Sequence, residues 1–186
     1  MAPKIVGSFP PTGFMPEQGI DEVADSTAKD TVGAIHTVYD STNNNWSLVA
    51  YYQAGATILQ GHALAHDQSQ RKTYRLVQAS IGLTLASGGN VGQIPRGFAA
   101  ADVSNTGYYS YRYIAGYCPT MNFISGVASN QVLAVSGSIA GAMSPFIVNA
   151  TLSDATHATV RLGCVYALDN IAATGLNSGV IQTFML

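Results

Sequence analysis

From Ala34 to Leu186, short runs of β-branched and aromatic residues alternate with clusters of Gly, Asn, Ser and Asp. The clearest case is a run from Ile35 to Tyr39, the turn-forming segment 40–45, and a second run from Trp46 to Tyr52, which is typical of a β-hairpin. Further strands are expected at 61–65, 74–85, 93–103, 108–117, 132–135, 146–148, 159–167 and 180–184.

This spacing favours a small β-barrel or sandwich, because a parallel sheet would need long helices between its strands. The only segments that could form helices, 17–28, 54–59 and 130–135, are short or weakly patterned. The sequence therefore predicts a mainly β fold.

The first 33 residues differ from the rest and are expected to form an extended arm, followed by a β domain over 34–186. Four of the seven prolines lie here (Pro3, Pro10, Pro11 and Pro16), and proline at this density removes backbone donors and disfavours regular pairing. The arm also carries apolar residues, Ile5, Val6, Phe9, Phe14 and Met15. We expect it to lie against a surface, either its own domain or a neighbouring subunit.

Charged residues make up only 10% of the chain and apolar residues 47%, whereas soluble domains usually contain about 25% charged residues. No apolar run is long enough to cross a membrane, so the surface itself is expected to be largely uncharged and partly covered by other subunits. A net charge of −2 argues against nucleic acid as a partner. The short basic cluster of Arg71, Lys72 and Arg75 is interpreted as a solvated loop.

The sequence indicates no enzyme, metal or cofactor. His62 and His66 are four residues apart, but on a strand this spacing separates them by about 13 Å, too far to share one ion. The chain has no Gly-x-Ser-x-Gly motif, and its glycine-rich segment 88–92 lacks the Lys and Ser or Thr of a phosphate-binding loop.

The two cysteines, Cys118 and Cys164, have no metal-binding or redox spacing. The N-terminus lacks the apolar segment of a signal peptide, which predicts synthesis in the cytoplasm and two free thiols. A single disulfide between the two is the alternative.

A tyrosine-rich run from Tyr108 to Tyr117 is the candidate contact strand. Alternation places Tyr109, Tyr111, Tyr113 and Tyr117 on one side and Tyr108 with Arg112 on the other, so that one side faces the core and the other a partner. The alternatives are aromatic packing between strands and stacking on a carbohydrate. The candidate interface residues are Phe9, Phe14, Met15, Tyr109, Tyr111, Arg112 and Tyr113.

Segments 97–110 and 163–178 of the chain resemble each other in sequence. Each contains a strand pattern, an aspartate (Asp102 or Asp169), a turn, a glycine (Gly107 or Gly175) and another strand. Three explanations account for this similarity equally well: duplication, chance, or two hairpin turns that need the same residues. Tight connections between strands require Asp and Gly in any case.

Three segments together resemble capsid decoration (cement) proteins of tailed bacteriophages. These are GQIPRGFAAADVSNTGYYSYRYIAG at 92–116, QAGATILQGHAL at 53–64, and the ending that begins GCVYALD at 163–169. The resemblance covers about 34–186 and implies a small barrel or β-tulip-like domain without catalytic residues, bound outside an icosahedral capsid and commonly grouped as trimers.

The resemblance therefore implies a structural protein of the virion surface, made in the host cytoplasm, whose partner is the major capsid protein. The alternative is a fibre or receptor-binding domain that engages glycan through its tyrosines. A secreted hydrolase or lectin would need the signal peptide that the N-terminus lacks.

Overall fold

A computed structural model describes residues 4–9, 24–40, 42–67, 75–79, 83–84, 90–91, 95–129, 133–136, 139–145 and 165–182. The fold is mainly β, as predicted, and the described residues contain no helix. The strands are β1 (Lys4–Phe9), β2 (Ile35–Asp40), β3 (Asn45–Ala54), β4 (Leu64–His66), β5 (Arg75–Gln78), β6 (Leu83–Thr84), β7 (Asn90–Val91), β8 (Phe98–Ala99), β9 (Tyr109–Phe123), β10 (Leu133–Val135), β11 (Met143–Pro145), β12 (Val165–Ala167) and β13 (Gly175–Ile181).

The predicted hairpin is confirmed. Strands β2 and β3 pair antiparallel in an unbroken register from Ile35 opposite Ala50 to Asp40 opposite Asn45. Among the other expected strands, the described part of 93–103 contains the two-residue β8, and the described part of 74–85 contains β5 and β6. The expected strand at 146–148 lies outside the described residues.

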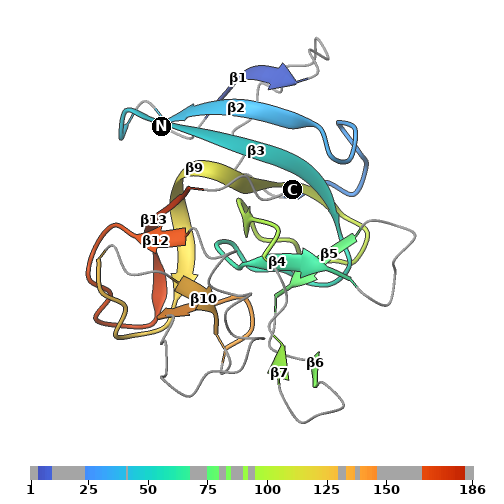
Figure 1. Ribbon diagram of the computed structural model, residues 1–186. Coiled ribbons are helices and arrows are strands. Elements are labelled where there is room, and N and C mark those ends of the chain that lie inside the picture. The colour runs from blue at the N-terminus through green and yellow to red at the C-terminus, as the bar shows by residue number, and fades with distance from the viewer. Residues whose placement is uncertain are drawn as a thin grey trace.

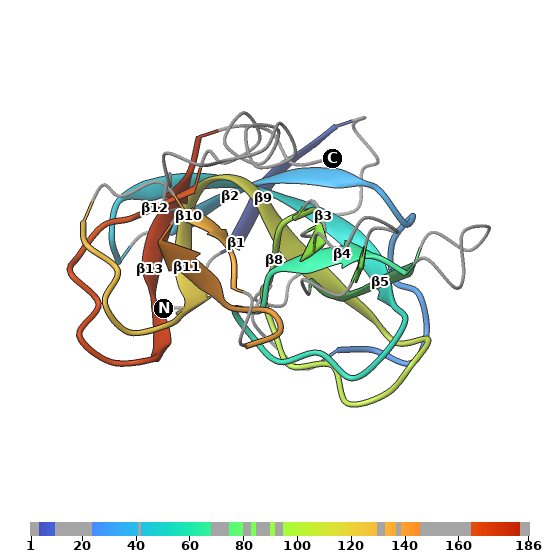
Figure 2. The ribbon, with the colours of Figure 1, turned by 60° about the horizontal axis from the view of Figure 1, so that its bottom comes forward.

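One large sheet follows the order β1-β2-β3-β9-β11-β10, and β13 pairs with the second half of β9. Figure 1 shows β9 running beside β3 and then bending down to lie beside β13, so that the sheet curls like half of a barrel (Figures 1 and 2). The bend includes Gly116, which has a φ of 81°. A Cβ at Gly116 would lie 2.5 Å from the carbonyl oxygen of Trp46, so only glycine allows β3 and β9 to approach here.

The N-terminal segment is more regular than its proline content predicts. β1 pairs antiparallel with β2 from Lys4 opposite Tyr39 to Phe9 opposite Ile35, with one irregularity between Ile5 and Gly7. The expectation of no regular pairing was wrong here because the prolines Pro3 and Pro10 flank this strand instead of interrupting it.

Two groups of buried side chains fill the interior. The larger group includes Val49, Tyr113 and Phe123, and the smaller is built around Tyr52, Ile58 and neighbouring residues. Adjacent residues of β9 contribute to burial on both of its faces, since Arg112 and Tyr113 are both buried. The long central strand is therefore covered on both sides.

Candidate functional site

The turn of the β2–β3 hairpin is held by local side-chain hydrogen bonds. The carboxylate of Asp40 accepts a hydrogen bond from the backbone N–H of Thr42 (2.9 Å) and another from the side-chain amide of Asn43 (2.7 Å). Asn44 adopts a left-handed conformation with a φ of 52°, which asparagine tolerates. Burial alone would raise the pKa of Asp40, but these hydrogen bonds outweigh it and lower that pKa. These hydrogen bonds hold Thr42 and Asn43 of the turn against Asp40.

An exposed tryptophan packs on a partly buried tyrosine beside this turn. Trp46, the only tryptophan, is 58% exposed, and its ring packs on Tyr39 with 4.7 Å between the ring centres. The hydroxyl of Tyr39 donates to Oδ1 of Asn44 (2.7 Å), which fixes the supporting ring. Tryptophan and tyrosine are prominent among the residues that dominate binding energy at protein interfaces. The Trp46 ring is therefore exposed and supported by a tyrosine that is itself held in place.

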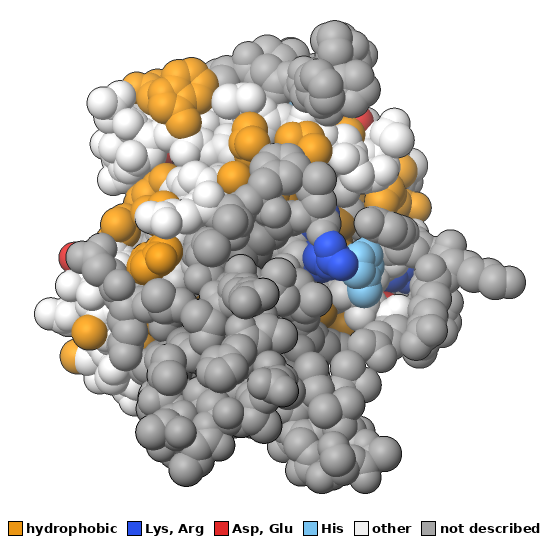
Figure 3. All heavy atoms as spheres, viewed as in Figure 1, with side chains coloured by type: hydrophobic (Ala, Val, Ile, Leu, Met, Phe, Trp, Pro, Cys, Tyr) orange, Lys and Arg blue, Asp and Glu red, His pale blue; other side chains and the backbone are white. Residues whose placement is uncertain are grey.

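Other large apolar side chains are also exposed. In Figure 3, hydrophobic side chains are scattered over the visible described surface among uncharged polar ones, with few charges. The remaining exposed large hydrophobic residues are Val32, Leu59, Ile139, Leu168 and Leu176. The described surface thus has the low-charge, partly apolar character that the composition predicted.

The tyrosine-rich strand does not form the contact face that the sequence predicted. Arg112 is 4% exposed and Tyr113 is 1% exposed, so neither is available to a partner on the surface. Tyr109 and Tyr111 are partly buried and pack on Tyr51 of β3, with ring centres 5.9 Å and 4.9 Å away. Of the three alternatives, aromatic packing between strands describes these tyrosines.

Residues 24–33, at the end of the expected arm, are fastened over these tyrosines. The backbone of Asp25 forms a two-way hydrogen-bonded bridge with Tyr109 (2.9 and 3.0 Å), and the backbone N–H of Lys29 donates to the hydroxyl of Tyr51 (3.0 Å). These contacts place the described part of this segment on its own domain. A neighbouring subunit is not needed to hold it.

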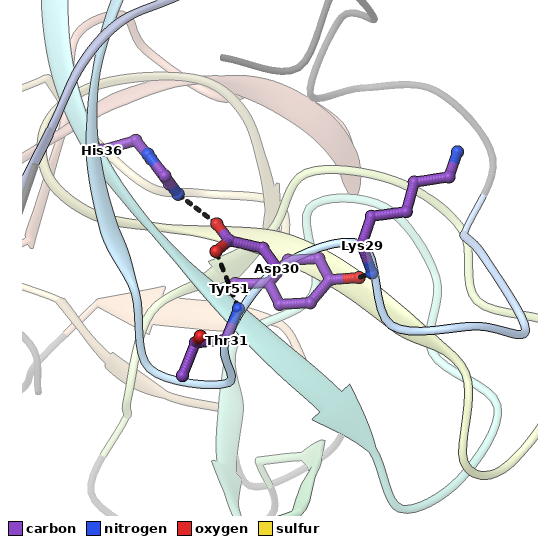
Figure 4. Close-up of polar contacts among 5 residues, drawn as sticks. All are labelled: Lys29, Asp30, Thr31, His36 and Tyr51. Carbon is purple, nitrogen blue, oxygen red and sulfur yellow. Dashed lines mark hydrogen bonds and ion pairs between the residues drawn. The ribbon is translucent and has the colours of Figure 1, made fainter. Parts of the chain in front are cut away.

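A buried acid–imidazole pair locks the same segment (Figure 4). Oδ2 of Asp30 lies 2.5 Å from Nε2 of His36, and the other carboxylate oxygen accepts from the backbone N–H of Thr31 (2.7 Å). The side chains of Asp30 and His36 are 4% and 0% exposed, and the ring of Tyr111 meets His36 edge-on. This arrangement ties residue 30 to β2 and forms a structural clamp.

Burial governs the titration of the tyrosines in this region. Loss of solvation raises the pKa of Tyr52 and of Tyr111, and it also raises the pKa of Tyr51 against an opposing hydrogen bond from Lys29. A phenolate at these positions would lose its hydration, and attraction to a nearby cation would not offset that loss. The folded state therefore favours the neutral phenols.

We expect the contribution of these tyrosines to stability to be constant up to about pH 10 and to fall above it, because the unfolded tyrosines ionise near that pH while the folded ones resist. Urea unfolding at a series of pH values measures this. Tyr52→Phe removes a buried hydroxyl without a hydrogen-bond partner in the described structure, so this variant should match the parent at neutral pH and lose less stability in alkali. Equal alkaline losses in the two proteins would contradict the assignment.

The described residues contain no group of three or more potential metal ligands. His62 is buried and Gly141 packs directly against its ring, and burial lowers the pKa of this histidine.

Cys118 is free and fully buried, and its thiol donates to the carbonyl of Thr120 (3.2 Å), whereas Cys164 lies outside the described residues. No helix in the described part of the chain is long and apolar enough to span a membrane.

Several predicted interface residues remain without a described side chain. Phe9 is the last residue of β1 and pairs through its backbone with Ile35, while Phe14 and Met15 lie outside the described residues. Trp46 was not among the predicted site residues, although a single tryptophan directly after an asparagine-rich turn indicates an exposed aromatic side chain. The Asp30–His36 pair was not predicted either, because the two residues belong to no recognisable sequence motif.

Comparison with protein families, curated proteins and solved structures found no match to this chain.

Proposed function

We propose that this protein is a structural component of a virion that binds the outer surface of a phage capsid, through the major capsid protein, and stabilises the shell. The observation that carries the proposal is the exposed ring of Trp46, packed on the partly buried Tyr39, on a described surface with few charges. Such a surface gains free energy when it is covered by another protein. The resemblance of segments 53–64 and 92–116 to capsid decoration proteins supports the same role.

A rigid aromatic contact suits this role, because a side chain that is already ordered loses little conformational entropy on binding. The hairpin bonds of Asp40 and the hydroxyl of Tyr39 hold the pair in place before a partner arrives. The alternative, glycan binding by the tyrosine-rich strand, is not supported, since Tyr109 and Tyr111 are partly buried beside residues 24–33.

The test uses DNA-filled shells of a phage deleted for the gene of this protein. The added protein should bind them saturably and raise the temperature at which they release DNA. Trp46→Ala should weaken binding on the order of tenfold or more, as expected for a central aromatic contact. Leu59→Ala, at a comparably exposed residue outside the hairpin, is the matched control and should bind nearly as the parent does.

If the protein fails to bind the shells, or if decorated and bare shells release DNA at the same temperature, the proposal is wrong. If binding occurs but Trp46→Ala and Leu59→Ala bind equally well, the attachment surface lies elsewhere on the molecule.

A further inference from the structure

The strands from β3 to β13 form two successive units with the same pairing pattern. In the first unit, β3 pairs antiparallel with β9 and parallel with β5, while β4 pairs antiparallel with β5 and β8 with β9. In the second unit, β9 pairs antiparallel with β13 and parallel with β11, while β10 pairs antiparallel with β11 and β12 with β13. Strand β9 closes the first unit and opens the second.

Individual hydrogen bonds repeat at matching positions of the two units. The matching bonds are Gly55 N to Leu76 O (2.8 Å) and Ile124 N to Met143 O (3.0 Å), Val103 N to Ile58 O (2.8 Å) and Ile171 N to Val127 O (2.8 Å), and Gln60 N to Asp102 Oδ1 (2.7 Å) and Ser129 N to Asn170 Oδ1 (2.9 Å). The partners keep a nearly constant spacing along the chain. The sequence similarity between 97–110 and 163–178 is thus part of a longer repeat, in which Asp102 corresponds to Asn170 instead of Asp169.

The buried side chains repeat as well. In the first unit they are Tyr52, Ala54, Ile58, Leu64, Leu76, Ala99 and Val103, and their counterparts in the second are Met121, Phe123, Val127, Leu133, Met143, Ala167 and Ile171. All of these residues are buried. Of the explanations left open for the sequence similarity, an internal duplication accounts for the shared topology, bonds and core together.

The two units differ at the position of Arg112. Arg112 lies opposite Ala99 in the first unit, and Gly179 lies opposite Ala167, the counterpart of Ala99, in the second. Gly179 therefore corresponds to Arg112. A Cβ at Gly179 would lie 2.6 Å from the sulfur of Met121, so the second unit leaves no room for a side chain where the first unit holds an arginine.

His66 also has an apolar counterpart. It is the last residue of β4, and Val135 takes the matching place at the end of β10, since β4 pairs with β5 as β10 pairs with β11. The second unit thus builds the same fold with apolar residues or glycine in place of Tyr52, His66 and Arg112. The fold does not require these polar groups, which indicates that they have another role.

The polar groups of the first unit point toward the same interior space. Arg112 lies on the face of β9 opposite to Tyr113, and His66 lies on the face of β4 that carries Leu64. Tyr113 belongs to the larger buried group, whereas Leu64 and Tyr52 belong to the smaller one. Arg112, His66 and Tyr52 are therefore directed to the side of the smaller buried group.

Arg96 completes a basic cluster with His66 and Arg112. Its backbone N–H donates to the carbonyl of Leu64 (2.6 Å), which places Arg96 beside β4. Burial lowers the pKa of His66, and the positive charges of Arg96 and Arg112 lower it further. Arg112 is 4% exposed, whereas Arg96 and His66 are half-buried, so the basic cluster extends from the surface into the interior. In Figure 3 a basic side chain lies against a histidine on the visible face.

The hydroxyl of Tyr52 lies at the buried end of the basic cluster. Burial raises the pKa of Tyr52, and Arg112 is near enough for its positive charge to oppose this effect. Tyr52 is 2% exposed, and its hydroxyl has no hydrogen-bond partner in the described structure. A buried hydroxyl without a partner destabilises a protein, so a bound acceptor beside Arg112 would relieve that loss.

We propose that the basic cluster of His66, Arg96 and Arg112, together with the hydroxyl of Tyr52, binds a tetrahedral oxyanion of the phosphate or sulfate class. Guanidinium groups donate paired hydrogen bonds to such anions. The donors come from β3, β4, β9 and the segment before β8, which suits the four oxygens of a tetrahedral anion better than the two of a carboxylate. Bound negative charge would also offset the repulsion among these basic groups. This site goes beyond capsid attachment and does not depend on it.

The first test titrates the full-length protein with sodium sulfate, whose charge does not change near neutral pH, while chloride keeps the ionic strength constant. NMR spectroscopy follows the ring of His66, assigned with the variant His66→Gln. The resonance shift should saturate, and the pKa of His66 should rise because the anion favours the imidazolium. Phosphate should compete with sulfate, and acetate should bind more weakly. A shift that does not saturate, an unchanged pKa, or equally tight binding of acetate overturns the proposal.

The second test compares substitutions that remove one donor each. Arg96→Gln should weaken sulfate binding on the order of tenfold, the usual effect of losing a hydrogen bond to a charged group. Tyr52→Phe should also weaken it, although its stability without sulfate should match the parent at neutral pH. Lys29→Gln removes the same charge from an exposed residue paired with Asp25 and is the matched control, which should bind sulfate as the parent does.

Parent-like sulfate binding by Arg96→Gln or by Tyr52→Phe, or an equal loss of binding in Lys29→Gln, overturns the proposal. Circular dichroism and urea unfolding without sulfate establish that each variant is folded. A protein that binds shells but not sulfate would overturn this inference and leave the proposed function standing.

Discussion

Replacing Asp30 with alanine should lower the free energy of unfolding by about 2–5 kcal/mol, because the substitution leaves a buried hydrogen-bonding group without its partner. The substitution leaves Nε2 of His36 buried without its acceptor and also deprives the backbone N–H of Thr31 of its partner. Since Asp30 ties residues 24–33 to the sheet, this segment should also become sensitive to protease. Urea unfolding followed by circular dichroism and limited proteolysis measure the two effects.

The matched control is Asp25→Ala. The carboxylate of Asp25 pairs with Lys29 at 2.8 Å, but both side chains are about 40% exposed (39% and 42%). Exposed pairs contribute only about 0–1 kcal/mol, and the backbone bonds of residue 25 to Tyr109 remain in this variant. If Asp30→Ala is no less stable than Asp25→Ala, the clamp is not a major source of stability.

The second large effect is expected for Phe123→Ala, at about 3–5 kcal/mol. Phe123 is fully buried at the end of β9, where it pairs with Gly175 of β13 and Met143 of β11. Truncating its ring would leave a cavity where three strands meet, and the backbone pairings on both sides of β9 limit how far the surroundings can collapse into it.

Phe123→Leu should cost clearly less, because it retains most of the apolar volume. Leu59→Ala should change stability by no more than about 0.5 kcal/mol, since Leu59 is 50% exposed. Equilibrium unfolding of the three variants provides the comparison. A loss below 1 kcal/mol for Phe123→Ala would mean that this junction is less tightly packed than its burial indicates.

The local features of the fold could be predicted from the sequence. The β2–β3 hairpin follows from alternation on either side of a polar turn, signals that lie within twenty residues of each other. The strand expected at 108–117 extends to Phe123 and includes Pro119, although proline is normally excluded from a central strand position. Here the register between β9 and β13 shifts between Asn177 and Gly179, opposite this part of β9, and such an irregularity accommodates a residue without an N–H.

The prediction that one face of the tyrosine-rich strand is exposed was wrong for Arg112 and Tyr113, because both faces of β9 are covered at these residues. Alternation correctly separates Arg112 from Tyr113, but it does not say that other segments cover both faces of β9. Arginine is rarely buried, so a surface position was the natural expectation for Arg112. The tyrosine-rich strand is covered by residues 24–33 and by the smaller buried group around Tyr52 and Ile58. Neither of these produces a periodic pattern in the sequence.

Strand β9 joins the two halves of the described sheet. Residues 109–116 of this strand pair with β3, and residues 116–123 pair with β13, so no linker separates the β3 half from the β13 half. Unfolding of β9 would therefore remove a pairing strand from both halves at once. We expect the two halves to unfold in one cooperative transition for this reason.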